Sequence, residues 1–231
     1  MFISTDAIIL KNTPYKESSV ISRLLSKEHG KISVIFKGAK RNNKSIAAVI
    51  EPGNIVNITY YNKSALKVAK EINLTKVYYS TREIVTHYYY TMAIISLLDK
   101  VCMEHQQYSD LYDLSIDVLE KIDEQKINID VLFIYFLLHL NKSIGYEIMT
   151  IDQSDIINDS KLYNDDIINI IKQLNQTIDV LYKLDADIIS KIDLINKLKI
   201  IIYKHMKHNI IDLNDINAIK MLKYIKDERT S

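Results

Sequence analysis

Four cations lie within eight residues of one another, and a glycine stands among them at position 38. Glycine allows a tight turn and a close approach of the backbone to a ligand. Lysine and arginine neutralise phosphates and release counterions whatever base is attached. The whole surrounding region is basic, which favours a phosphate-binding loop over an ordinary solvated loop. The candidate nucleic-acid-binding residues are Lys37, Lys40, Arg41 and Lys44 of the loop, with Arg23 and Lys31 nearby in the same region.

Aromatic side chains could complete a site for a single strand by stacking on its bases. Tyr60 and Tyr61 are adjacent on a predicted strand, so one of the two must face outward. Tyr15 is a further candidate. Packing within the protein is favoured over stacking for each of these tyrosines, and stacking stays an open alternative here.

Motifs of catalysis are missing from the sequence. It contains no glycine-rich phosphate loop, no His-Glu-x-x-His helix and no Gly-x-Ser-x-Gly elbow. His205 and His208 are one helical turn apart without an acidic third ligand, and Asp152 to Asp159 is typical of helix capping. Cys102 lies on an apolar stripe and is expected to be an inert buried thiol. We therefore predict no catalytic residue, no metal and no cofactor.

The net charge of +1 conceals two opposite parts. Residues 1–80 hold 13 Lys and Arg against 5 Asp and Glu, whereas the remainder holds 17 against 24. This asymmetry indicates a polyanionic partner for the N-terminal part.

The first 80 residues alternate apolar and polar side chains, the pattern of half-buried strands. Glycine and proline separate the runs, and five short strands are the number of a small Greek-key barrel of the OB type. The strands are expected at Ile3–Lys11, Ser18–Ser26, Ile32–Phe36, Asn54–Tyr61 and Leu66–Tyr79.

Beyond Tyr79 the apolar spacing becomes helical, and Ser80 with Glu83 forms a predicted capping box. The segment from Val131 to Leu140 is apolar almost all round, which predicts a central helix. The fold class is thus α+β, with an OB-fold nucleic-acid-binding domain at 1–80 and an all-α domain at 81–231. Helices are expected from Ser80 to Cys102 and at about 110–122, 130–142, 165–184, 187–207 and 214–226.

A single cysteine excludes a disulfide framework within one chain, and no apolar stretch approaches the roughly 20 residues of a membrane span. We expect a cytoplasmic protein without a membrane partner.

Several short motifs together resemble the bacterial recombination mediator RecO. The resemblance follows Tyr15, Glu17 and Ser18, and then three runs and Pro52: Glu28-His29-Gly30-Lys31-Ile32, Lys37-Gly38-Ala39-Lys40-Arg41, and, within the helices, Leu97-Leu98-Asp99 with Ile144-Gly145-Tyr146. It implies an OB fold followed by helices. It also implies a non-enzymatic protein, associated with the bacterial nucleoid, that binds single- and double-stranded DNA and anneals complementary strands. With RecR, such proteins load RecA onto strands coated by single-strand-binding protein, contacting its acidic tail.

Within the resembling motif, Lys37 and Arg41 take the positions where the family presents DNA-contacting cations. Many members carry a four-cysteine zinc module after the Gly-Tyr pair, but residues 147–164 contain no cysteine. The resemblance therefore implies an irregular insertion without zinc. Two alternatives stay open: an OB-fold RNA-binding protein of translation or RNA processing, and an enzyme with an acidic metal site.

Overall fold

The computed structural model describes residues 1–40, 44–62, 66–148, 165–182 and 192–230. These residues form two compact units. The first comprises Met1–Tyr79 with Thr91–Asp113, and the second comprises Ser80–Tyr90 with Leu114–Ser231. The predicted division into domains at 1–80 and 81–231 stays a prediction. The predicted insertion at 147–164 falls almost entirely outside the described residues.

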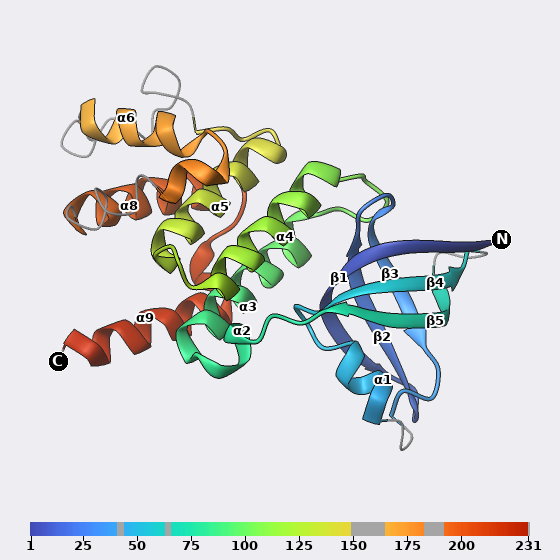
Figure 1. Cartoon of the computed structure of the whole chain (residues 1–231). Helices are drawn as coiled ribbons and strands as arrows, with labels where there is room; N and C mark the ends of the chain where they lie inside the picture. Colours follow the sequence, from blue (N-terminus) through green and yellow to red (C-terminus); the bar gives the residue numbers. More distant parts are fainter. Residues whose placement is uncertain (41–43, 63–65, 149–164, 183–191, 231) are drawn as a thin grey trace. The chain divides into compact units, whose positions relative to one another are not determined.

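A closed five-stranded barrel makes up most of the first unit (Figure 1). The strand order is β1-β2-β3-β5-β4, with β4 returning to β1, and β3 pairs in parallel with β5. This arrangement confirms the predicted OB-type barrel followed by helices. Its elements are β1 (Phe2–Tyr15), β2 (Ser19–Ser26), β3 (Gly30–Phe36), α1 (Lys44–Val49), β4 (Ile55–Tyr61) and β5 (Lys67–Lys76).

Side chains at alternate positions of the strands fill the interior of the barrel. On β3, Ile32, Val34 and Phe36 point inward and are buried, whereas the residues between them are only half-buried. The period of two found in the sequence therefore corresponds to a closed apolar interior. The core cluster consists of Ala7, Ile9, Leu24, Ile32, Val34, Phe36, Ala39, Ile50, Val56, Ile58 and Tyr60.

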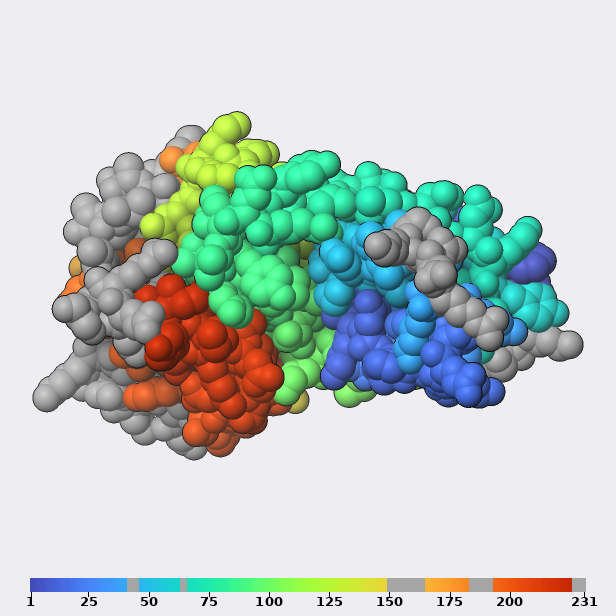
Figure 2. All heavy atoms as spheres, turned by 90° about the horizontal axis from the view of Figure 1, so that it is seen from below, coloured from blue at the N-terminus to red at the C-terminus, as the bar shows by residue number. Residues whose placement is uncertain are grey.

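The helices follow the barrel in sequence. α5 carries an unbroken buried run from Val131 to Leu138, as its apolar character predicts. The Asn128 side chain caps its N-terminus by accepting a hydrogen bond from the N–H of Asp130 at 2.9 Å. α9 lies on the surface of the second unit (Figure 2). The bounds are α2 (Ser80–Glu83), α3 (Val85–Val101), α4 (Ser109–Glu124), α5 (Ile129–Ser143), α6 (Asp165–Leu174), η1 (Ile178–Val180), α8 (Ile192–Asn209), η2 (Leu213–Asp215) and α9 (Asn217–Thr230).

Two local predictions need correction. The N–H of Ser80 donates to the carboxylate of Asp123 at 2.8 Å, in the place where the predicted capping box has Glu83. The helix predicted over 165–184 ends at Leu174 and gives way to a short 3-10 turn. In the first case Asp123, distant in sequence, takes the place of Glu83, because any nearby carboxylate can accept the free N–H groups at the start of a helix.

The segment Thr91–Asp113 packs on the barrel through the β2–β3 hairpin. The N–H of His105 donates to the carbonyl of Lys31 at 3.3 Å, and the Gln107 amide donates to the carbonyl of Glu28 at 2.5 Å. A Cβ at Gly30 would lie 1.8 Å from the carbonyl oxygen of Gln106. Glycine is therefore required at position 30 both by its φ of +65° and by the close approach of this segment.

Alanine at Gly30 and at Gly38 separates the two reasons for glycine: a positive φ, and a lack of space for a Cβ. Both residues have positive φ, but nothing lies within 4 Å of a Cβ at Gly38. We expect Gly38→Ala to lower the free energy of unfolding by about 1 kcal/mol through backbone strain alone. Gly30→Ala should lose a further 1–3 kcal/mol, roughly, through overpacking. Urea denaturation measures both, and equal losses would contradict the packing of residues 91–113 on this hairpin.

Candidate nucleic-acid interface

The turn after β3 presents two of the predicted cations. Gly38 turns the chain with a φ of +74°, and Ala39 is buried in the barrel core. The backbone N–H of Lys40 then donates to the carbonyl of Ser18 at 2.9 Å, which holds the turn against the β1–β2 connection. Because Ala39 anchors the turn from inside, Lys37 and Lys40 are both exposed to solvent.

The ammonium groups of these two lysines differ in their surroundings. Lys40 Nζ donates to the carbonyl of Lys16 at 3.1 Å. Lys37 has no acidic partner among the residues that the structure describes. Both groups are exposed and can approach a phosphate. Arg41 lies outside the described residues, and Lys44 begins α1 with a side chain that is likewise not described.

Arg23 and Lys31 are engaged inside the first unit. Arg23 Nη2 lies 2.5 Å from Asp99 Oδ2, and Lys31 Nζ donates to the carbonyl of Asp99 at 2.8 Å. Next to them, Ser33 Oγ donates to Glu104 at 2.9 Å. These bonds fasten the end of α3 to the outward side of β2 and β3. The structure thus brings Lys37 and Lys40 together at one turn and gives Arg23 and Lys31 structural partners elsewhere.

The two adjacent tyrosines point to opposite sides of β4. Tyr60 is 1% exposed and belongs to the barrel core, where burial and the charge of Glu28 raise the pKa of its phenol. Tyr61 is 38% exposed and faces outward. Tyr15 is half-buried, with Lys16 Nζ 5.4 Å from its ring centroid. Of the pair left open by the sequence, Tyr61 is the one that can meet a ligand outside the barrel.

The remaining reactive groups have structural surroundings. Burial raises the pKa of the Cys102 thiol to about 12, so it stays protonated and unreactive at neutral pH. His205 Nε2 lies 2.9 Å from the carbonyl of Tyr146, and burial lowers the pKa of its imidazole. Over the described part of the chain, no three His, Cys, Asp or Glu side chains come together as metal ligands would.

The second unit contains a groove of about 580 Å³. Lys199 Nζ, at one side, lies 2.5 Å from Asp130 Oδ1, and the Tyr90 hydroxyl donates to the same carboxylate. Burial and this carboxylate raise the pKa of Tyr203 to about 12. The groove combines an apolar floor with lysines: its lining is Tyr90, Asn196, Lys199, Ile200, Tyr203, Lys204, Ile219, Leu222 and Lys223.

Comparison with known families identifies the family of the barrel and of the helices that follow it. Residues 1–78 match the family model described as recombination protein O N terminal, and residues 82–153 match recombination protein O C terminal. The chain belongs to the RecO family. The first match coincides with the barrel and its five strands, and the second begins at α2.

Individual relatives are between 25% and 29% identical to the chain over the aligned residues. The DNA repair protein RecO of Syntrophomonas wolfei is 26% identical over 146 residues, which cover 63% of this chain and 58% of the relative. That of Listeria monocytogenes is 29% identical over 119 residues, 52% of this chain and 47% of the relative. That of Pelodictyon phaeoclathratiforme is 25% identical over 149 residues, 64% and 57%. The chain thus spans about half the length of the curated relatives that it matches.

None of the helices in the described ranges has the length and apolar character that crossing a bilayer requires.

Proposed function

We propose that this RecO family protein is a non-enzymatic recombination mediator in DNA repair that binds single- and double-stranded DNA through its barrel. The observation that carries the proposal is the anchored turn, which exposes Lys37 and Lys40 with Ala39 buried between them. Arg41 and Lys44 extend the same basic stretch in sequence. The names of its relatives, DNA repair protein RecO, support the same role.

Charge neutralisation by this turn provides a route to annealing. Two complementary strands repel each other through their phosphates, and bound cations lower that repulsion while displacing counterions. Contacts to phosphate leave base edges available for pairing with a second strand. Neither nucleotide hydrolysis nor a metal is required. If all four cations of the loop contact phosphates, the slope of log K against log salt on single strands should be about −3.

The double substitution Lys37→Glu and Lys40→Glu tests this proposal. Each lost phosphate contact should reduce the magnitude of the salt slope by about 0.7 on single strands, and affinity at low salt should fall by roughly tenfold or more. Annealing of complementary oligonucleotides should slow in parallel. Fluorescence anisotropy and strand-annealing assays measure the two effects.

Lys172→Glu combined with Lys220→Glu is the matched control, since both lysines are exposed, on α6 and α9, and the pair carries the same charge change. It should leave binding and annealing near the wild-type level. Unchanged binding in the double variant would contradict the proposal. A firm preference for structured RNA over single-stranded DNA would instead favour the RNA-binding alternative.

The proposed partners follow from the family: RecR, single-strand-binding protein and, through them, RecA, in the bacterial cytoplasm at the nucleoid. For the acidic tail of single-strand-binding protein we propose the groove of the second unit. Its lysines complement acidic side chains, and its apolar floor, with Ile219 and Leu222, would bury apolar ones. The exposed Lys204 is one of the lysines that an acidic tail would meet.

Lys204→Glu should weaken binding of a synthetic acidic tail peptide by about tenfold, because it places a like charge beside the peptide. Titration calorimetry with the full chain measures this affinity. Lys172→Glu again serves as the control and should bind the peptide normally. Equal affinities of the wild type and the Lys204 variant would exclude the groove as the tail site while leaving DNA binding by the barrel untouched.

A further inference from the structure

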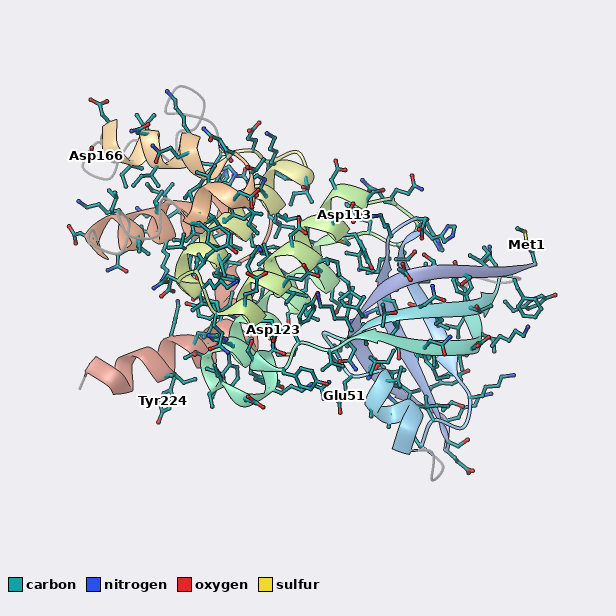
Figure 3. All side chains as sticks on the ribbon, viewed as in Figure 1. Met1, Glu51, Asp113, Asp123, Asp166 and Tyr224 are labelled. Carbon is teal, nitrogen blue, oxygen red and sulfur yellow. The ribbon has the colours of Figure 1, made fainter. Side chains whose placement is uncertain are left out.

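Two aromatic rings are exposed side by side at the end of the barrel. Phe2 and Tyr61 are directly opposite each other on β1 and β4, with ring centroids 5.3 Å apart. Their side chains are 54% and 38% exposed. Figure 3 labels Met1, the residue before Phe2, at the tip of β1. More than a third of each residue stays exposed to solvent and neither belongs to the core cluster, so packing in the barrel core does not explain this pair.

Strand register continues the pair into a row across the outside of the barrel. Tyr61 is opposite Val68 on β5, Val68 is opposite Ile35 on β3, and Ile35 is opposite Ile21 on β2. None of these side chains belongs to the core cluster, which takes the alternate positions of the same strands. The row takes one residue from each strand and so follows the curved outer wall of the closed barrel, along a path of roughly 19 Å at a strand spacing of about 4.8 Å.

Positive charge flanks this row. Lys70 Nζ lies 4.6 Å from the ring centroid of Phe2. Lys37, of the anchored turn, follows two residues after Ile35. On the strands, the outward carboxylates of Glu71 and Asp6 lie further along β5 and β1, opposite Thr59 and Asn57 of β4. Glu17 is exposed in the β1–β2 connection. A negatively charged ligand is therefore favoured along the row and disfavoured beyond it.

We propose that this row is a platform for the unpaired bases of single-stranded DNA, with Phe2 and Tyr61 as the stacking residues. The inference rests on the proposed function and adds to it: the lysine turn binds phosphates of any DNA, whereas the row selects strands whose bases are free. Aromatic rings beside cations are the combination that single strands use, since every base offers a π face. A base pair within a duplex is already stacked on both faces and gains nothing from the rings.

The test compares three ligands of one length: oligothymidylate, an abasic strand and a blunt duplex. Alanine at both Phe2 and Tyr61 should reduce affinity for oligothymidylate by about tenfold or more. The same variant should bind the abasic strand and the duplex as the wild type does. Lys37→Glu should weaken all three. A C-terminal tag keeps Phe2 accessible, and Tyr79→Ala, which removes a 70% exposed aromatic of the same unit, is the matched control.

The outcomes separate the two proposals. If the Phe2 and Tyr61 variant binds all three ligands like the wild type, or weakens all three equally, the stacking proposal fails and phosphate binding stands. If the wild type binds none of the ligands, both fail. If the variant changes the oligomeric state while its affinity for DNA stays the same, the row is an interface between copies of the chain and the proposal fails.

Tyr61→Trp supplies a direct reporter, because the chain contains no tryptophan. This variant should keep the wild-type affinity, since it retains an aromatic ring. Its fluorescence should be quenched by oligothymidylate and not by the abasic strand. Equal quenching by both strands would overturn the assignment of stacking.

Discussion

The carboxylate of Asp99 is only 10% exposed and lies 2.5 Å from the guanidinium of Arg23. A carboxylate removed from water needs a cation beside it, and Arg23 supplies one while Lys31 bonds the carbonyl of the same residue. This contact joins the end of α3 to β2 and β3, and the packing of Gln106 against Gly30 follows from it. Arg23 and Lys31, two of the cations that make the first 80 residues basic, therefore have partners within the protein. At the opposite end of β3, the turn leaves Lys37 and Lys40 exposed to solvent.

The same end of the barrel holds features that packing does not require. Ala39 anchors the turn from within, which allows the lysines on either side of it to remain in solvent. The outward row from Phe2 to Ile21 ends beside this turn. The cations that we propose for phosphate contact and the rings that we propose for base stacking are thus positioned by one sheet and its adjoining turn.

The strands could be predicted from the sequence because one face of each strand is buried inside the closed barrel, which makes apolar and polar side chains alternate. In β3, buried and half-buried residues alternate at every position. The central helix α5 was equally evident from its apolar run. The six-residue α1 was missed, since so short a segment carries too little periodicity. The structural role of Arg23 could not be predicted, because its partner lies 76 residues away and only the fold brings them together. Phe2 was missed for the same reason: its position opposite Tyr61 depends on register, which composition does not reveal.

Mapping of amide chemical shifts during titration of the intact chain with a single-stranded oligonucleotide tests the central claim most directly. The claim is that DNA contacts the Lys37–Lys40 turn and the row beside it. It does not contact the part of β2 and β3 that Asp99 covers. We predict the largest shift changes at Ile35 to Lys40 and along the row through Val68 and Tyr61, with little change from Arg23 to Ser33. Largest changes at Arg23, Lys31 and Asp99, or confined to the helices of the second unit, would contradict it.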